Sequence, residues 1–437
     1  MEKIVVVGGG LAGCETALQL ASRGLQVELI EMRPGKMTPA HRTGSLAELV
    51  CSNSLKSDNA ETASGLLKRE LRMLGCKLLK IASESRVPAG HALAVDRDVF
   101  SGKVGEVVAK ESMIELSGRE QIDLDIPVGV IATGPLTSDL LSSAVMEHFG
   151  KDNLFFYDAI SISIAVDSID HSKVFKASRY GKGAPDYWNV PLDKENYLLL
   201  LEYIRKSSKR AGHDFEDGKC FEACLPVEVM VSRGDDVMRY GPLKPRGLVD
   251  PVTGEEPYAV IQLRQESIEG TIAGLVGFQT KMTVGAQKGM MALIPGLENA
   301  EIVRFGAIHR NTFLDSPYLL DKRQMSSRRD GLFFAGQITG VEGYVESIAH
   351  GLITSINIFE YLEGHPPVIF PSETLLGGLQ AHLTSQSSRF QPMNANFGIL
   401  PPISGKRRER KAKKVERSLT KLKSFLDKQS FDMPRST

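Results

Sequence analysis

The chain has 437 residues, and its 53 Lys and Arg residues balance 53 Asp and Glu residues. This balance excludes a polycation, so any attraction to nucleic acid must come from a local patch. The five cysteines are scattered and there is no run of about 18 apolar residues, so we expect neither a disulfide framework nor a membrane span. The sequence therefore predicts a cytoplasmic protein with more than one domain.

The N-terminal segment has the pattern of a strand, a helix and a second strand. Residues 3–7 (KIVVV) form a β-branched run, residues 14–24 have helical spacing, and residues 27–31 (VELIE) end in an acid. The intervening GGGLAG loop lets the backbone approach a pyrophosphate at the positive end of the helix. The carboxylate of Glu31 can accept a hydrogen bond from a ribose hydroxyl. The motif predicts a dinucleotide site, for FAD or NAD, at Gly8, Gly9, Gly10, Leu11, Ala12 and Gly13.

Two later segments favour FAD over NAD. Residues 128–135 (VGVIATGP) have the pattern of an apolar strand and a turn. Residues 331–351 contain the strand LFFAG, a glycine-rich loop and a helix that starts near Tyr344, and we expect this helix N-terminus to face the flavin. The glycines predicted to bind the cofactor here are Gly134, Gly336, Gly340 and Gly343.

The middle of the chain is rich in Gly and Pro and contains short alternating runs at 161–166 (SISIAV) and 258–264 (YAVIQLR). This pattern indicates an α+β domain inserted into the FAD-binding domain. The predicted divisions are the first part of the FAD-binding domain at 1–150, the insertion at 151–300, the return segment at 301–404 and a basic helix at 405–437.

The C-terminal segment 405–426 is strongly basic. Val415, Leu419, Leu422 and Leu426 recur at helical spacing, which predicts an amphipathic helix that docks through its apolar side. Its Lys and Arg side chains form either a solvated face or a surface for a phosphate backbone, and the sequence leaves both interpretations open.

Several stretches along nearly the whole chain resemble one family. They are IEMRP (30–34), TPAHRTGSLAELVCSNSLKS (38–57), FEACLPVEVM (221–230), GFQTKMT (277–283), HRNTF (309–313), GVEGYVES (340–347) and FQPMNANFGILPP (390–402). These motifs are similar to those of the folate- and FAD-dependent tRNA (uracil-5-)-methyltransferases, in the MnmG/TrmFO group of flavoproteins.

The resemblance implies an α/β fold, with a Rossmann-like FAD-binding domain of the glutathione-reductase type and an inserted α+β domain. It implies a bacterial, cytoplasmic enzyme that methylates C5 of the T-loop uridine of tRNA. The implied carbon donor is 5,10-methylenetetrahydrofolate, and NADH or NADPH is the implied reductant of FAD. We expect no metal site and no obligate protein partner.

The two cysteines that matter in this family fall on Cys51 and Cys224. A thiolate that adds to C6 of uracil makes C5 nucleophilic, and a base must later remove the C5 proton. We predict that Cys224 adds to C6 and that Cys51 handles the proton, with the reverse assignment open. A nearby cation such as Lys56 is expected to lower the pKa of the attacking thiol.

Other residues are predicted from their positions in these motifs. Tyr344, in the glycine-rich loop, is expected to lie against the flavin or the substrate base. The residues predicted to bind folate are His309, Arg310 and Asn311. The cysteines predicted to be buried, small apolar residues are Cys14, Cys76 and Cys220.

Three alternatives remain open from the sequence. A sister enzyme on the same scaffold methylates a uridine of ribosomal RNA. An NAD(P)H-dependent flavin oxidoreductase acting on a small molecule would use the two cysteines as redox partners. A non-catalytic RNA-binding protein that retains FAD would depend on the basic tail and not on the thiols.

Overall fold

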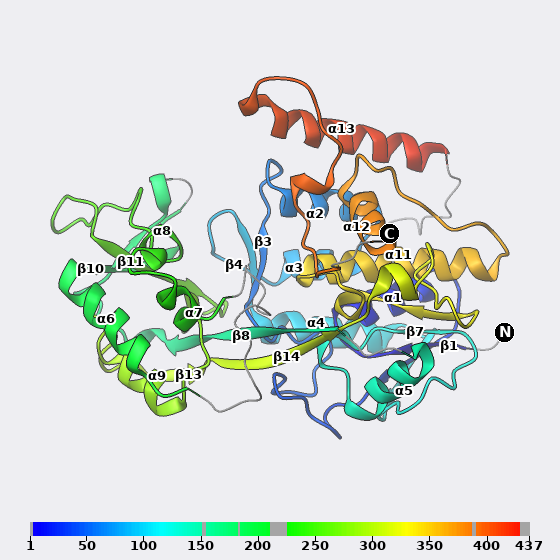
Figure 1. Ribbon diagram of the computed structural model, residues 1–437, viewed down its shortest axis with the longest axis horizontal. Helices are drawn as coiled ribbons and strands as arrows, with labels where there is room; N and C mark the ends of the chain where they lie inside the picture. Colours follow the sequence, from blue (N-terminus) through cyan, green and yellow to red (C-terminus); the bar gives the residue numbers. More distant parts are fainter. Residues whose placement is uncertain (1–2, 151–153, 182–183, 210–224, 387–389, 429–437) are drawn as a thin grey trace.

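The computed structural model describes residues 3–150, 154–181, 184–209, 225–386 and 390–428. These residues form a five-stranded, a seven-stranded and a three-stranded sheet. In Figure 1 the first sheet and its helices lie at one end of the molecule and the second sheet at the other, joined by the long strands β8 and β14. Within the described residues, no helix combines the length and apolarity needed to cross a bilayer.

The first sheet is parallel throughout, and its five strands come from both ends of the chain. The predicted strands at 3–7 and 27–31 are confirmed. Parallel pairing between such distant segments needs crossover connections, as expected of the α/β class. In spatial order the strands are β15 (Leu332–Phe334), β7 (Gly129–Ile131), β1 (Ile4–Val7), β2 (Val27–Glu31) and β6 (Ile114–Gly118).

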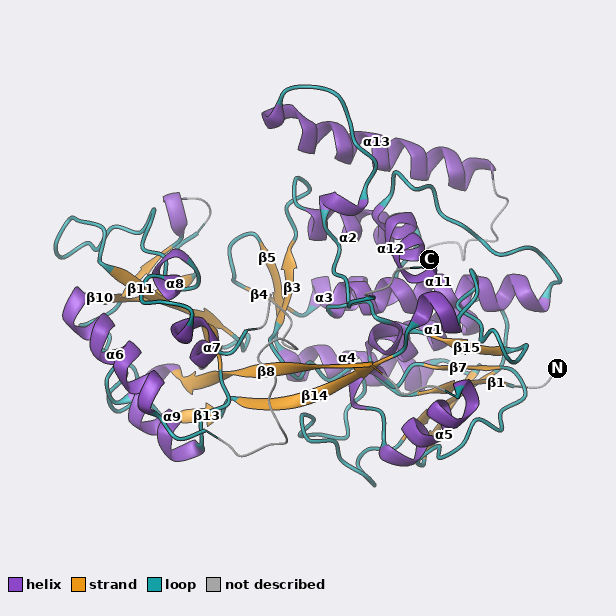
Figure 2. Cartoon of the chain, viewed as in Figure 1, coloured by secondary structure: helices purple, strands orange, loops and turns teal. Residues whose placement is uncertain are grey.

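Different helices cover the two faces of this sheet (Figure 2). One face packs against α1 (Leu11–Ala21) and α11 (Tyr344–Leu362), and the other packs against α5 (Asp139–Phe149). Side chains alternate along β1. Val6 packs into the core between the sheet and the helices α1 and α11, which we call the first core, whereas Val5 packs into the core between the sheet and α5. A parallel sheet buried on both faces is the Rossmann-like FAD-binding fold that the sequence predicts.

The second sheet is antiparallel and carries its own apolar core. Its strands in spatial order are β13 (Ile302–Arg304), β8 (Leu154–Ala165), β12 (Ile272–Gln279), β11 (Ala259–Gln265), β10 (Tyr187–Leu192) and β9 (Phe175–Ala177), with β14 (Ala307–Phe313) also paired to β8. Its helices are α6 (Lys194–Lys206), α7 (Val227–Ser232), α8 (Val237–Tyr240) and α9 (Val284–Met291). Because β14 belongs to this sheet, the boundary predicted at residue 300 falls inside it.

A small third sheet lies beside the first domain core. It contains β3 (Ser54–Ser57), β5 (Ala92–Val95) and β4 (Arg86–Val87), with the helices α2 (Ala63–Met73), α3 (Lys77–Glu84) and α4 (Arg97–Lys110). Cys14 and Cys76 are buried in this core, as predicted, and burial raises the pKa of both thiols. Cys220 lies outside the described residues.

The C-terminal segment adds the helices α10 (Ser316–Leu319), α12 (Leu375–Thr384) and α13 (Arg407–Lys428). Val415 and Leu422 of α13 are buried in the first core, while Leu419 and Leu426 are partly buried against it. The predicted amphipathic docking of the basic tail is therefore confirmed.

A buried carboxylate ties α13 to the rest of the domain. Glu70 on α2 is fully buried, and it accepts hydrogen bonds from the Leu375 and Leu376 N–H groups at 2.9 Å and from the Ser418 hydroxyl at 2.5 Å. The carboxylate thus caps the start of α12 and holds the middle of α13. Burial raises the pKa of Glu70 to about 7, although its three hydrogen-bond donors favour the ionised form.

This raised pKa predicts a specific pH dependence of stability. Between the ordinary carboxyl pKa of 4.5 and about 7, the unfolded state loses the Glu70 proton before the folded state does. Stability contributed by Glu70 should therefore be fully present below about pH 4.5 and be lost as pH rises to 7. At ~1.4 kcal/mol per pKa unit the loss is at most about 3 kcal/mol. Urea unfolding of wild type and Glu70→Gln across this range measures it, and a stability difference that stays constant or grows with pH would contradict it.

Candidate functional site

The GGGLAG loop makes a tight turn between β1 and α1. Gly8 has φ = +106°, a conformation that favours glycine. At Gly13 a Cβ atom would lie 1.8 Å from the Gly8 carbonyl oxygen, so a larger residue cannot fit. At Gly10, the residue before α1, a Cβ atom would have no other atom within 4 Å. The turn is therefore closed on the protein side and open where a ligand would approach the start of the helix.

A cavity opens at this turn. Its lining includes Gly8, Gly10, Glu31, Arg33 and Thr133, from the ends of neighbouring strands of the first sheet. Within α1, all of whose residues are described, the first turn carries no acidic side chain and no side-chain cap. Its N–H groups and positive dipole end are therefore suited to an anion. The cradle fits the pyrophosphate of FAD, and the predicted positions from Gly8 to Gly13 lie together here.

Glu31, predicted to accept a ribose hydroxyl, already accepts four N–H groups from the protein. Its carboxylate receives the Gly9 N–H at 2.9 Å, the Arg33 N–H at 2.9 Å, and two guanidinium bonds from Arg33 at 3.0 Å. Burial opposes ionisation of Glu31, but the bonds and charge of Arg33 lower its pKa. A carboxylate offers about four acceptor positions, so a ribose hydroxyl would have to replace one of these donors.

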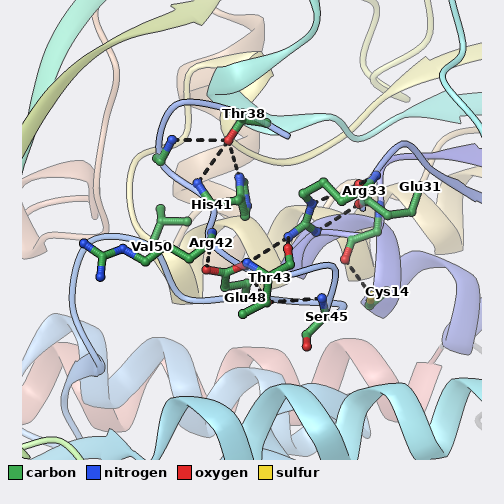
Figure 3. A network of polar contacts seen from close by, with 12 residues as sticks. Cys14, Glu31, Arg33, Thr38, His41, Arg42, Thr43, Ser45, Glu48 and Val50 are labelled. Atoms are coloured by element: carbon green, nitrogen blue, oxygen red, sulfur yellow. Dashed lines mark hydrogen bonds and ion pairs between the residues drawn. The ribbon is translucent and has the colours of Figure 1, made fainter. Parts of the chain in front are cut away.

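Arg33 links this carboxylate to the loop that leads to Cys51 (Figure 3). Its Nη1 also donates to Glu48 at 3.2 Å, and Glu48 accepts the N–H groups of Arg42 and Thr43 at 2.9 and 3.1 Å. The Thr43 hydroxyl donates to the same carboxylate at 2.8 Å. The nucleotide cradle and the segment before Cys51 therefore share one chain of charge-assisted hydrogen bonds.

The return segments lie against the first loop. Gly134 begins the short helix η1 (Gly134–Leu136), next to Thr133 of the cavity lining. Gly336 begins η6 (Gly336–Thr339), and a Cβ atom there would lie 2.5 Å from the Cβ of Ala12. Gly340 follows η6, and a Cβ atom there would lie 2.6 Å from the Phe390 ring. The structure thus brings the predicted glycines of three distant segments to one edge of the first sheet.

A buried histidine fixes the second of these turns. The Nδ1 atom of His350, on α11, accepts the Gly336 N–H at 2.9 Å. Burial lowers the pKa of His350 to about 3, so the ring is neutral and acts as an acceptor here. Gly343 precedes α11, which begins at Tyr344 as predicted. The second turn of α11 therefore lies beside the Gly336 turn and the start of α1, and the contact of its N-terminus with the flavin stays a prediction.

Residues 50–53, which we call the Cys51 loop, are bound to α11 through Tyr344. The tyrosine oxygen accepts the Cys51 N–H at 2.7 Å and the Ser52 N–H at 3.1 Å. Burial raises the pKa of Tyr344 above its usual range, so the phenol stays protonated at neutral pH. The oxygen of Tyr344 is a fixed support for the backbone around Cys51. The contact of its ring with the flavin or the substrate base stays a prediction.

A second contact joins α11 to the chain that follows Cys51. The Lys56 ammonium lies 3.0 Å from the carboxylate of Glu346, which is fully buried. The same Glu346 oxygen accepts the Ala395 N–H at 3.0 Å, which ties the FQPMNANFG motif to the site. Lys56, considered from the sequence as a cation that activates a thiol, is thus the ion-pair partner of Glu346.

The remaining predicted residues are less fully defined. Cys224 lies outside the described residues. His309 and Arg310 lie on β14, opposite Asp158 and Tyr157 of β8, and their side chains are outside the described part. Asn311 follows on β14 and is fully buried, and neither of its amide atoms has a hydrogen-bond partner among the described residues.

Several polar residues of this site have no clear signal in the sequence. Arg33 and Glu48 lie inside motifs of the resemblance, but their pairing across the loop is a tertiary contact. Glu346 and His350 have the spacing of ordinary positions in an apolar helix, and their burial identifies them. For Glu346 the available signal is its acidic side chain in the first turn of α11.

The fold and the cradle define an α/β protein with a Rossmann-like FAD-binding fold. The family model described as "Glucose inhibited division protein A" matches residues 3–366. A structure of GidA from Aquifex aeolicus aligns with 99% of this chain and 74% of its own, with a TM-score of 0.70 at 18% identity. That likeness supports the fold alone.

Sequence relatives narrow the family further. A protein of Syntrophomonas wolfei is 50% identical over 97% of this chain and 99% of its own length, and one of Geobacter sulfurreducens is 49% identical over 97% and 98%. Both carry the name methylenetetrahydrofolate–tRNA-(uracil-5-)-methyltransferase TrmFO. The chain belongs to the TrmFO family, and FAD is its cofactor.

The contact between Tyr344 and the Cys51 loop predicts a measurable loss in a conservative variant. Tyr344→Phe leaves the N–H groups of Cys51 and Ser52 without their acceptor, so the free energy of unfolding should fall by about 1–3 kcal/mol. The matched control is Tyr240→Phe, since Tyr240 is 75% exposed; its effect should stay within about 0.5 kcal/mol. Urea unfolding measures both, and equal losses in the two variants would contradict the support role.

Proposed function

We propose that this protein transfers a one-carbon unit from 5,10-methylenetetrahydrofolate to C5 of the T-loop uridine of tRNA and reduces it to a methyl group. The observation that carries the proposal is the hydrogen bond that the Cys51 N–H donates to the oxygen of Tyr344, at the N-terminus of α11. The same helix packs against the nucleotide cradle, so a uracil held by the Cys51 loop would lie beside the cofactor. The reaction would take place in the cytoplasm.

The chain supplies the positions that this chemistry needs. When bound, FAD supplies the reducing equivalents, drawn from NADH or NADPH, that turn the transferred carbon into a methyl group. The N–H groups at the start of α1 would hold the pyrophosphate, and the open position at Gly10 leaves room for it. The α11 N-terminus, with its neutral His350 and its buried Glu346, would fix the other side of the cofactor site.

Two thiol tasks follow from the chemistry of uracil. A thiolate adds to C6 and pushes an electron pair to C5, which then bonds to the one-carbon unit. A base next removes the C5 proton, and the one-carbon unit separates from its donor nitrogen, which leaves a methylene on C5. A hydride equivalent then adds to that carbon as the bond between C6 and sulfur breaks, which returns the thiolate. We assign the addition to Cys224 and the proton transfer to Cys51. Both assignments are predictions from the family motifs, and the Cys51 backbone is held firmly enough to serve either task.

A single assay tests this function. The purified protein is incubated with labelled 5,10-methylenetetrahydrofolate, NADPH and an unmodified tRNA transcript, and label in the RNA is measured. Wild type should label the tRNA, whereas Cys51→Ala and Cys224→Ala should each lose about 10²–10⁴-fold in rate, because each removes a group that makes or breaks a bond. Cys76→Ala, a buried thiol of the core, is the matched control and should retain activity.

Two of the alternatives give different results in this assay. Label in ribosomal RNA but not in tRNA would assign the sister reaction. NADPH oxidation that needs no RNA, with loss in both cysteine variants, would indicate a thiol oxidoreductase. A transcript with cytidine in place of the T-loop uridine should accept no label, and labelling of that transcript would contradict the proposed position.

The basic face of α13 supports an RNA substrate. The outward-facing lysines include Lys411, Lys413 and Lys423, all exposed, although Lys413 also lies 3.6 Å from the Glu409 carboxylate one turn away. Other cations of the helix serve the protein itself, since Lys414 donates to the Phe397 carbonyl at 2.6 Å and Arg417 to the Pro401 carbonyl at 2.6 Å. The basic residues of α13 therefore fall into two groups. Lys414 and Arg417 bind the protein itself, and the exposed lysines are available to phosphates.

Neutralising the available set should weaken the salt dependence of tRNA binding. Each phosphate contact contributes about 0.7–0.9 to the slope of log K against log salt, so the Lys411→Gln, Lys413→Gln, Lys423→Gln triple variant should reduce that slope by about 2. The control is Lys110→Gln with Lys206→Gln, whose side chains are 78% and 74% exposed on other helices. A slope unchanged in the triple variant would make the α13 face merely solvated.

A further inference from the structure

Asn53 lies two residues after Cys51 and is fully buried. Its amide nitrogen donates to the carbonyl oxygens of Val95 and Gln265, each at 3.0 Å. Its Oδ1 accepts a hydrogen bond from the Nε of Arg264, also at 3.0 Å. Both donor positions and the acceptor of this side chain are therefore used, and all three partners lie on other elements.

These bonds join three parts of the molecule. Val95 ends β5 of the small sheet, and its own N–H donates to the Asn53 carbonyl at 2.9 Å. Arg264 and Gln265 end β11 of the second sheet. A short polar side chain at this junction fixes the Cys51 segment against both sheets, because buried hydrogen bonds of this kind have little freedom of direction.

Residues 50 to 53 are anchored one after another. Arg304, on β13, donates through Nη1 to the Val50 carbonyl at 3.3 Å. Tyr344 accepts the N–H groups of Cys51 and Ser52, and Asn53 binds β11 through Arg264. The second sheet thus holds the chain on both sides of Cys51, and α11 holds it at the cysteine itself.

We propose that Asn53 is a positioning residue that fixes the Cys51 thiol relative to the second sheet. The inference rests on the proposed function in one respect, namely that Cys51 acts on the uracil. A thiol that must meet a ring carbon or its proton depends on placement to within a fraction of an ångström, and loss of such placement lowers turnover more than binding.

The chain offers a matched control in Asn189. It is also fully buried, donates to the carbonyls of Phe175, Ala177 and Tyr187 at 3.0–3.2 Å, and accepts from Gln262 at 3.0 Å. All of these partners belong to the second sheet or its neighbouring loops, and none belongs to the Cys51 loop. Asn189→Ala therefore removes a comparable set of buried bonds without touching the junction.

The test measures the reactivity of the Cys51 thiol directly. After reduction, full-length wild type, Asn53→Ala, Arg264→Ala and Asn189→Ala are treated with iodoacetamide, and alkylation of the Cys51 peptide is followed by mass spectrometry. Asn53→Ala and Arg264→Ala should alkylate at least about fivefold faster than wild type because the loop is released, and Asn189→Ala should stay within about twofold. In the tRNA assay the first two should lower kcat by about 10-fold or more, with KM changed far less.

The two readouts separate this inference from the proposed reaction. Alkylation needs neither RNA nor folate, so it decides the positioning role by itself. Unchanged alkylation in both Asn53→Ala and Arg264→Ala, or an equal change in Asn189→Ala, would overturn it. Arg264 is only partly buried, so its variant keeps the test open if Asn53→Ala fails to fold. Wild type that places no label in RNA would instead overturn the proposed function.

Discussion

The close approach of α1 to α11 is the constraint on which the rest of the site depends. A Cβ atom at Gly351 would lie 2.4 Å from the Ala12 carbonyl oxygen, and the Thr16 hydroxyl donates to the carbonyls of both Ala12 and Gly351, at 2.8 and 3.0 Å. Backbones can pack this tightly only where a side chain is missing. The contact fixes the second turn of α11 against the start of α1, so the N-terminal turn of α11 extends beyond this contact toward the Cys51 segment.

The N-terminus of α11 connects this helix contact to the loop that carries the Cys51 thiol. Tyr344 is the first residue of α11, so the position of the helix fixes the position of the phenol oxygen that binds the Cys51 loop. The second sheet then holds the other side of the same loop through Arg264 and Arg304. The Cys51 segment therefore lies at a junction of the first and second sheets, where hydrogen bonds and the ion pair between Lys56 and Glu346 hold it.

Local sequence patterns predicted the elements whose causes are local. The β-branched run of β1, the glycine loop and the stripe of Val415 and Leu422 on α13 each follow from residue spacing, and the structure confirms all three. The division predicted at residue 300 does not include the pairing of β14 with β8, because that pairing joins segments about 150 residues apart and no local pattern records it. The sequence likewise does not predict that Arg33 occupies the acceptor positions of Glu31. The motif shows which residue is acidic, but not what its carboxylate already binds.

The anchored state of Glu31 changes how its part in the site should be understood. In this structure its charge is neutralised by Arg33, and Arg33 is in turn shared with Glu48 of the loop before Cys51. A ribose hydroxyl that displaced one guanidinium bond from Glu31 would leave Arg33 more fully to Glu48. The acid at the end of β2 is thereby linked, through Arg33 and Glu48, to the loop before Cys51.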